Sequence, residues 1–278
     1  MATCVPQGFR LAGVHCGIKS DPRKPDLTLA VALEPAVAAG VYTQNLVYAA
    51  PVAFDRQRTP SDRIRVVVAN SGNANACTGE RGLRDAGEMA KLAARACGAE
   101  EDQALVLSTG IIGEYLPMEK IAQGVEAATA RLGSDEDALV SAAQGMMTTD
   151  KYHKLAGRTL TLGTKRIQIT GMTKGAGMIG PRMATMLGLL MTDAALEPDV
   201  AQAQLAAAVE VTFNCISVEG HMSTNDTVLL LASGAAAPTP LAGDDLAAFG
   251  RALCEVCEEL ARAIPADGEG ASHLVTLE

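Results

Sequence analysis

Hydrophobic patterns typical of strands and helices alternate along the first half of the chain. Apolar runs at Ile64–Ala69 and Ala104–Ser108 predict two buried strands, and the spacing of apolar positions between them predicts a helix at about Leu83–Cys97. Pro117 suits the first turn of a second helix, which carries an apolar stripe from Ile121 to Leu132. Strands and helices mixed along one chain favour a layered α/β architecture.

In the second half the hydrophobic period changes from helical to two. After a third helix at about Asp135–Gly145, apolar residues alternate from Leu160 to Ile169 across an expected hairpin turn at Gly163–Lys165. A Gly-rich turn and an apolar stretch at Ala184–Met191 follow. Beyond them the pattern predicts two helices and one strand, at Pro198–Val211, Leu246–Ile264 and Val228–Ala232.

Charge and composition narrow the functional classes. The formal net charge of −9 disfavours nucleic acid as a partner, because phosphate binding needs a basic surface. No apolar stretch has the length of a membrane span, and residues 1–13 lack a secretory signal pattern. These features predict a cytoplasmic protein that binds neither nucleic acid nor a membrane.

The cysteines and histidines do not form a metal-binding pattern. The seven cysteines are scattered and odd in number, which favours free thiols in a reducing compartment. Cys254 and Cys257 form a C-x-x-C pair within a periodic helix, and no second pair completes a zinc site. The four histidines lack metal-ligand spacing, so we expect no metal site.

The Gly-rich turn allows two different chemistries. Residues 175–180 match the dinucleotide pattern G-x-G-x-x-G, but they lie deep in the chain and Asp193 follows too early for a ribose contact. A turn that needs a flexible backbone is the better interpretation. Thr185, which follows this turn, is compatible with a nucleophile that cleaves the bond before it and is released with a free α-amine as its base.

Another candidate site lies at the end of the predicted strand Ala104–Ser108. A threonine hydroxyl and a glycine N–H, here Thr109 and Gly110, can form an oxyanion hole for a tetrahedral intermediate. Strand-end Thr–Gly pairs are common, so this pair predicts little when taken alone. The amides of the loop at Asn70–Asn75 are expected to tie down backbone rather than to take part in catalysis.

Six motifs occur in a fixed order along the chain: Asn70-Ser-Gly-Asn-Ala-Asn-Ala-Cys-Thr-Gly79, Ser108-Thr-Gly-Ile-Ile-Gly113, Met147-Thr-Thr-Asp150, Lys174–Met186, Ser223-Thr-Asn-Asp-Thr227 and Asp267-Gly-Glu-Gly-Ala271. In this order they make the sequence resemble the ornithine acetyltransferase family, also known as bifunctional glutamate N-acetyltransferases of cyclic arginine biosynthesis. The resemblance extends from Gly8 to the last residue. Six separate motifs in one order make a chance match very improbable.

The resemblance implies acetyl transfer through Thr185. The bond Ala184–Thr185 would be cut autocatalytically, so that one catalytic α/β domain, 1–278, becomes the chains 1–184 and 185–278 of an αββα sandwich. Thr185 would take the acetyl group from N2-acetyl-L-ornithine, release L-ornithine, and pass the group to L-glutamate in a ping-pong cycle. The family implies a heterotetramer of two copies of each chain and no cofactor, and it leaves open whether acetyl-CoA also serves as a donor.

The resemblance also implies roles for individual residues. The oxyanion hole would be formed by Thr109 and Gly110, and the substrate would be held by Thr149, Lys174, Thr185 and Glu269. Lys174 suits a substrate α-carboxylate, and Glu269 suits the cationic amine of ornithine. For both residues a structural alternative remains, because Lys174 can be a solvated loop residue and Glu269 can simply be exposed in its turn.

The sequence departs from the family pattern at three places. His221 stands where the family has a carboxylate, and Arg182 alters the cleavage motif, so both are expected to affect specificity rather than the nucleophile. Residues 274–278 read as the start of a strand, from which we expect that the family's C-terminal part is missing. Three alternatives therefore stay open: an amidase or aminopeptidase that passes the acyl group to water, an inactive remnant, and an NAD-dependent enzyme built on residues 175–180.

Overall fold

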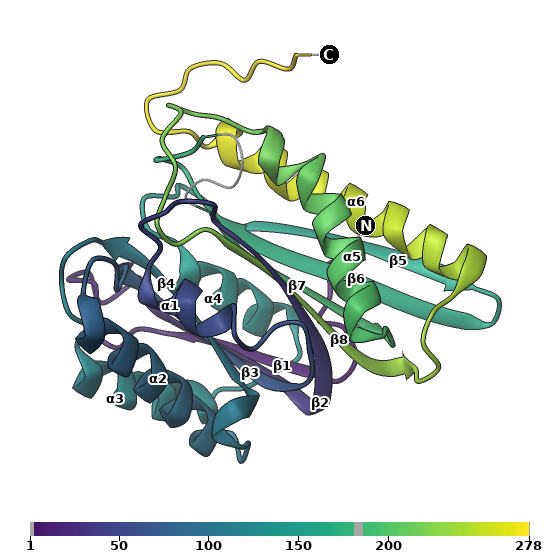
Figure 1. Ribbon diagram of the computed structural model, residues 1–278, viewed down its shortest axis with the longest axis horizontal. Coiled ribbons are helices and arrows are strands. Elements are labelled where there is room, and N and C mark those ends of the chain that lie inside the picture. The colour runs from purple at the N-terminus through teal and green to yellow at the C-terminus, as the bar shows by residue number, and fades with distance from the viewer. Residues whose placement is uncertain (1–2, 181–185, 278) are drawn as a thin grey trace.

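The computed structural model, which describes residues 3–180 and 186–277, shows a mixed α/β fold (Figure 1). Helices and strands alternate along these residues as the hydrophobic pattern predicts. In chain order the elements are β1 (Phe9–Val14), β2 (Leu27–Tyr42), α1 (Ala50–Asp55), β3 (Ser61–Asn73), α2 (Gly79–Ala96), β4 (Ala104–Ile111), α3 (Met118–Thr129), α4 (Glu136–Met146), β5 (Lys154–Leu162), β6 (Lys165–Lys174), β7 (Leu187–Ala194), α5 (Pro198–Glu210), β8 (Thr227–Ala237) and α6 (Gly243–Ala266), with short 3-10 turns at Glu101–Gln103 and Phe213–Cys215.

The strands form one sheet in the order β4-β3-β2-β8-β7-β6-β5, with β1 paired to β2. The pairs β3–β4 and β7–β8 are parallel, and the other neighbouring pairs are antiparallel. The long strand β2 joins the two halves, because its first part pairs with β1 and β3 and its last part pairs with β8. The β2–β3 register shifts between Val31 and Ala38, which marks a bend in the sheet.

The bend turns the two halves of the sheet towards each other. Alternate residues of the strands point to opposite faces: Val67 of β3 and Leu229 of β8 belong to one inner cluster, whereas Val66 and Leu230 face outwards into two different clusters. Inner residues from both halves of the sheet pack together, as do Leu105 of β4 and several α4 residues. The result is two sheet layers that share a core, which is the inner part of an αββα sandwich.

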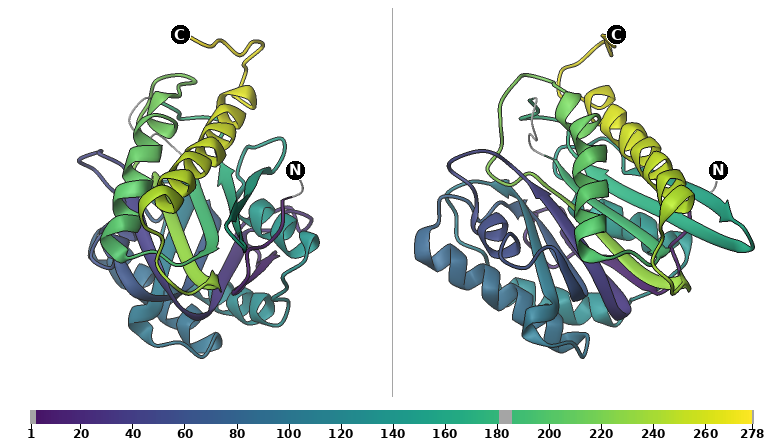
Figure 2. Two further views of the ribbon diagram at one scale, coloured as in Figure 1. Left: turned by 90° about the vertical axis from the view of Figure 1, so that its right-hand side faces the viewer. Right: turned by 45° about the vertical axis from the view of Figure 1, so that its right-hand side comes forward.

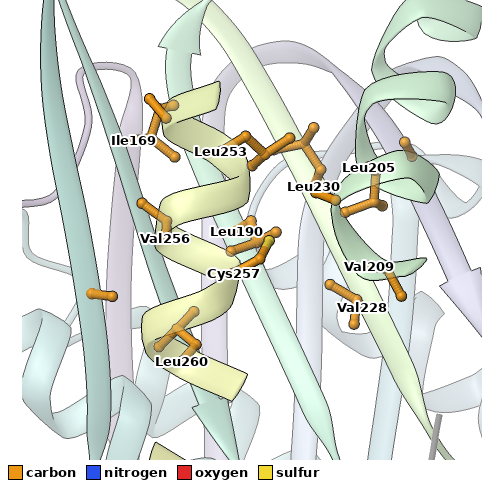
Figure 3. Packing of buried hydrophobic residues seen from close by; sticks show 14 of the residues in the cluster. Ile169, Leu190, Leu205, Val209, Val228, Leu230, Leu253, Val256, Cys257 and Leu260 are labelled. Atoms are coloured by element: carbon orange, nitrogen blue, oxygen red, sulfur yellow. The ribbon is translucent and has the colours of Figure 1, made fainter. Parts of the chain in front are cut away.

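Helices cover both outer faces. Helix α2 packs on the outer face of β3 and β4, and α3 lies beside it on β1 and β2, at the opposite end of the molecule from α5 and α6 (Figures 1 and 2). Helix α6 covers β5 and β6, and its apolar residues Leu253, Val256 and Leu260 share a cluster with Leu190 of β7, while Leu205 of α5 lies against β8 (Figure 3). The predicted αββα sandwich is therefore confirmed.

Most of the predicted elements are present, and the differences lie at the chain ends and at β7. The strands β1 and β2, at residues 9–14 and 27–42, lie where the pattern gave no prediction. The apolar stretch after the Gly-rich turn is strand β7, and the expected strand at 274–278 is wrong, since residues 271–277 are exposed and have no regular structure. None of the helices in the described residues combines the length and apolar character that a membrane crossing requires.

Candidate active site

Five of the six residues with predicted roles line one pocket of about 750 Å³. They come from four separate segments of the chain: Thr109, Gly110, Thr149, Lys174 and Glu269. The sixth, Thr185, lies outside the described residues together with Ala184 and Arg182. Met186, the next residue along the chain, is described and buried.

The pocket forms where strand ends from the two halves of the sheet meet. Thr109 and Gly110 lie near the carboxyl end of β4, and Lys174 is the last residue of β6. The Lys174 ammonium donates a hydrogen bond to Thr109 Oγ1 across 3.1 Å. Because that oxygen accepts from the lysine, its own hydrogen remains available for a third group, as an oxyanion-hole donor requires.

Gly110 occupies a position that only glycine fits. Its φ is +133°, and a Cβ built there would lie 2.3 Å from the carbonyl carbon of Gly72 on β3. Gly72 pairs with Gly110 in the β3–β4 register, so the obstacle is backbone and cannot move aside cheaply. The close approach of two strand ends is therefore built into this corner of the pocket.

Gly110→Ala should combine backbone strain with this overlap. We expect the variant to lose about 2–4 kcal/mol of unfolding free energy, which corresponds to a Tm lower by roughly 5–10 °C. Gly113→Ala is the matched control, because Gly113 also has a positive φ, +89°, but its Cβ would meet nothing within 4 Å. Thermal unfolding that places both variants at the same Tm would contradict the overlap argument.

Lys174 is not a solvated loop residue, because its side chain is buried and the residue is only 2% exposed. Burial lowers its pKa, while the carboxylates of Asp150 and Asp226 act in the opposite direction. No ion pair holds its ammonium among the described residues, and its hydrogen bond goes to the Thr109 hydroxyl. The group therefore retains donors with which to bind a substrate carboxylate.

A buried ion-pair network holds two segments of the pocket in place. Lys154, at the start of β5, places its Nζ 2.7 Å from both Asp150 Oδ1 and Asp267 Oδ2, and all three side chains are inaccessible to solvent. Burial alone raises the pKa of Asp150, but Lys174, Lys154 and the N–H of Gly175 outweigh it and hold that pKa below its ordinary value. This network therefore fixes the segments that carry two pocket residues, Thr149 directly before Asp150 and Glu269 two residues after Asp267.

Glu269 and Thr149 lie at the open side of the pocket and are exposed. The Glu269 N–H donates to the carbonyl of Ala176 across 2.7 Å, and its carboxylate packs on Gly177 so closely that a Cβ there would lie 2.7 Å from Cδ. Glu269 is therefore exposed and is also part of the pocket lining. A carboxylate in this position can meet the ammonium of a bound ligand without first breaking a protein ion pair.

Two further residues hold the site together, and both lie in the motif at residues 223–227, where no role was predicted for them. Asn225 donates from Nδ2 to the carbonyls of Ala74 and Ser108, at 2.7 and 2.9 Å, and so joins the start of β8 to the ends of β3 and β4. Asp226 accepts the Met186 N–H at Oδ1 across 3.0 Å, and burial raises its pKa to about 7 against the opposing effects of that N–H and of Lys174. In the sequence, the polar run before the apolar strand at 228–232 could have indicated both residues.

The structure also tests the predictions made for the Gly-rich turn and for the Asn-rich loop. Residues 175–180 do not open a βαβ unit, because β6 and β7 pair antiparallel, so the dinucleotide interpretation is wrong. The structural role of the Asn-rich loop is confirmed: Asn75 Nδ2 donates to Gly82 O, and Asn73 Oδ1 accepts from Asn75 N. Within residues 3–180 and 186–277, no group of His, Cys, Asp and Glu side chains is placed to hold a metal ion.

Comparison with known proteins identifies a family. The family model for ArgJ matches residues 10–278. The arginine biosynthesis bifunctional protein ArgJ of Rhodopirellula baltica is 46% identical over 272 residues, which cover 97% of this chain and 66% of that protein. The protein of the same name from Geobacter sulfurreducens is 47% identical over 271 residues and is covered to 68%. The chain thus spans about two thirds of the length of these curated relatives.

Solved structures agree with this assignment. An ornithine acetyltransferase from Mycobacterium tuberculosis, crystallised with ornithine, has a TM-score of 0.57 at 36% identity and covers 64% of this chain and 95% of its own. The fold is shared more widely, since an aminopeptidase from Ochrobactrum anthropi, described as a variant of the Ntn hydrolase fold, has a TM-score of 0.57 at 11% identity. The six ordered motifs, the pocket that five of the assigned residues share, and these matches lead to one conclusion: the chain belongs to the ArgJ family.

Proposed function

We propose that this chain transfers an acetyl group from N2-acetyl-L-ornithine to L-glutamate through an ester on Thr185. The observation that carries the proposal is the Lys174–Thr109 contact in a pocket that also contains Gly110, Thr149 and Glu269. It brings a hydroxyl donor, a cation and a carboxylate together in one pocket. An acyl-transfer site needs those groups: donors for an oxyanion and opposite charges for a zwitterionic amino acid.

The nucleophile would be produced by self-cleavage. Thr185 Oγ attacks the carbonyl of Ala184, the peptide nitrogen leaves as the α-amine of Thr185, and water hydrolyses the resulting ester. Two solved family chains support a division here, because each is covered to more than nine tenths yet accounts for only 65% or 64% of this chain, about the share that 1–184 represents. By resemblance the two pieces stay associated, with two copies of each in the assembly, in the cytoplasm and without a cofactor.

In the first half-reaction Thr185 takes the acetyl group. Its hydroxyl adds to the acetyl carbonyl of N-acetylornithine while its α-amine accepts the hydroxyl proton. Thr109 and the Gly110 N–H would stabilise the negative oxygen that forms. The C–N bond then breaks, and the proton passes to the leaving α-amine of ornithine. Lys174 would hold the substrate α-carboxylate, and Glu269 would hold the side-chain ammonium.

In the second half-reaction glutamate replaces ornithine in the same pocket. Its α-amine attacks the ester carbonyl, and the C–O bond to Thr185 breaks with return of the proton to the hydroxyl. The oxyanion donors serve both half-reactions because both pass through a tetrahedral intermediate. Acetyl-CoA can enter the same scheme as a thioester donor, which a donor comparison would reveal.

Thr109→Ala should slow both self-cleavage and transfer by about 10²–10³-fold, as expected when one oxyanion donor is removed. Thr109→Ser is the matched variant, because it keeps the hydroxyl that accepts from Lys174. We expect it to recover most of the rate. Single-turnover release of ornithine measures the effect, and an alanine variant as fast as the parent would remove Thr109 from the oxyanion hole.

The direct test of the proposed function follows both products of the reaction. The chain is incubated with N-acetylornithine, with and without glutamate, and ornithine, N-acetylglutamate and acetate are quantified. We expect N-acetylglutamate to form in step with ornithine when glutamate is present. Acetate as the main product in both reactions would instead indicate an amidase that passes the acyl group to water, and ornithine absent from both would contradict acyl transfer altogether.

A further inference from the structure

Part of the wall of the pocket is made by the loop between β1 and β2. Residues Ile18, Lys19 and Lys24 of this loop line the pocket. The loop is tied down by Asp26, whose fully buried carboxylate accepts the N–H of Cys16 at 2.6 Å and the N–H of Lys19 at 2.9 Å. It therefore presents its side chains from a fixed backbone rather than from a free loop.

The loop also packs on the oxyanion corner. A Cβ on Gly72 would lie 2.9 Å from Cγ2 of Ile18, so the loop rests directly on the strand end that meets Gly110. Lys19, the next residue, is consequently held beside the reacting region and not at a distant rim. Position and rigidity are the two properties that a specificity residue needs.

The ammonium of Lys19 is only partly used by the protein. It donates to the carbonyl of Pro25 across 2.6 Å, and within the described residues no carboxylate forms an ion pair with it. Asp21, which also lines the pocket, is engaged by Arg23 at 2.9 Å instead. Lys19 thus faces the pocket with hydrogen-bond donors to spare.

Lys19 and Lys174 place two cations on one pocket. They lie close enough for the charge of Lys174 to affect Lys19, together with Asp26, Lys24 and Asp150. Burial, the largest effect, lowers the pKa of Lys19 to about 8. An anion bound between two such ammonium groups would relieve both their mutual repulsion and the loss of solvent.

We propose that Lys19 binds the side-chain carboxylate of the acceptor glutamate, while Lys174 binds the α-carboxylate that donor and acceptor share. This inference rests on the proposed function and deepens it. N-acetylornithine carries one carboxylate and a side-chain ammonium, whereas glutamate carries two carboxylates, so one pocket must serve side chains of opposite charge. Glu269, from the segment after α6, and Lys19, from the β1–β2 loop, both line the pocket and would divide that task between them.

The division has a consequence for pH dependence. The Lys19 side chain is charged below about pH 8 and loses its proton as the pH rises through that value. The affinity for glutamate should therefore fall above about pH 8. The lowered pKa of Lys174 affects glutamate and ornithine alike, so it is the affinity for glutamate relative to ornithine that should fall through this range. Carboxylate binding opposes the effect by raising the pKa of Lys19, which moves the fall to somewhat higher pH in the complex.

Calorimetric binding of three free amino acids to the whole chain tests the inference. Glutamate, glutamine and ornithine are compared on the parent chain, on Lys19→Gln and on Lys165→Gln, an exposed control at the other end of β6. We expect Lys19→Gln to weaken glutamate about 10-fold, which is the scale of one partly exposed charge-assisted contact, and to abolish the preference for glutamate over glutamine. Ornithine binding and the control variant should be unchanged.

Two outcomes would overturn the inference and leave the proposed function intact. In the first, Lys19→Gln weakens glutamate and ornithine alike, which would place Lys19 at the shared α-carboxylate. In the second, the preference for glutamate over glutamine persists in the variant. A parent chain that binds neither glutamate nor ornithine would overturn the proposed function as well, so the two failures are distinguishable.

Discussion

Thr185→Ala should leave the chain in one piece and reduce acetyl transfer at least about 10⁴-fold, because the proposed nucleophile serves both self-cleavage and the ester intermediate. The variant removes only a hydroxyl and a methyl group, so the fold is expected to persist. Denaturing electrophoresis and the N-acetylornithine assay measure the two effects. Transfer that survives in an uncut alanine variant would remove Thr185 from the mechanism.

Thr185→Ser and Thr161→Ala are the controls for that experiment. Serine keeps a hydroxyl at the same place, so cleavage and transfer should persist at a lower rate. Thr161 is an exposed threonine of β5, and its replacement should change neither reaction. Equal defects in Thr185→Ser and Thr185→Ala would indicate a role for the threonine methyl group rather than for nucleophilic attack.

Lys154→Met should be the most destabilising single change in the support of the pocket. It leaves Asp150 and Asp267 buried without the cation that lies 2.7 Å from each. Removing one partner of a buried ion pair costs about 3–5 kcal/mol, which lowers the Tm of a chain of this size by roughly 10 °C. Thermal unfolding measures the loss, with the exposed Lys165→Met as the control.

The defect of Lys154→Met should also depend on pH. The pKa of Asp150 is held below its ordinary value in the folded chain, so its contribution to stability is present above the unfolded-state pKa of about 4 and is lost as the pH falls through the folded value. The protonated carboxyl no longer needs a cation. The Tm difference between parent and variant should therefore be largest near neutral pH and shrink towards pH 3, and a constant difference would argue against the ion pair.

The elements that the sequence predicted are those with a clear local period. Helix α6 presents an apolar stripe that the 3.6-residue period reveals, and the β5–β6 hairpin has strict alternation around Gly163. Strand β2 was missed because Pro35 interrupts its middle, where a proline normally argues against a strand. In the folded chain Pro35 falls between the two runs of β2–β3 pairing, where the ladder is already broken.

Strand β7 shows a second limit of pattern reasoning. All eight of its residues, Leu187–Ala194, are buried, because the inner core lies on one face and α6 on the other. A strand covered on both faces has a continuous apolar run and no alternation, so its period carries no information. The sandwich itself, and not the local sequence, makes this segment a strand.

Part of the candidate site was predicted, and the prediction came from sequence motifs rather than from a local hydrophobic period. The motifs identified Thr109, Gly110, Thr149, Lys174 and Glu269, and the pocket brings them together. The residues that support them act through contacts between distant segments, such as Lys154 with Asp267, 113 positions further along the chain. No local period or spacing reports such a contact. Lys19 was missed for the same reason, since its place on the pocket depends on how the β1–β2 loop packs on Gly72.

Intact mass under denaturing conditions, recorded on freshly purified chain before and after addition of N-acetylornithine, would reveal both the self-cleavage and the acetyl ester on Thr185. We expect two species divided between Ala184 and Thr185, with one acetyl group added to the fragment that begins at Thr185. A chain that stays whole, a division at another bond, or an acetyl group on the fragment that ends at Ala184 would contradict it.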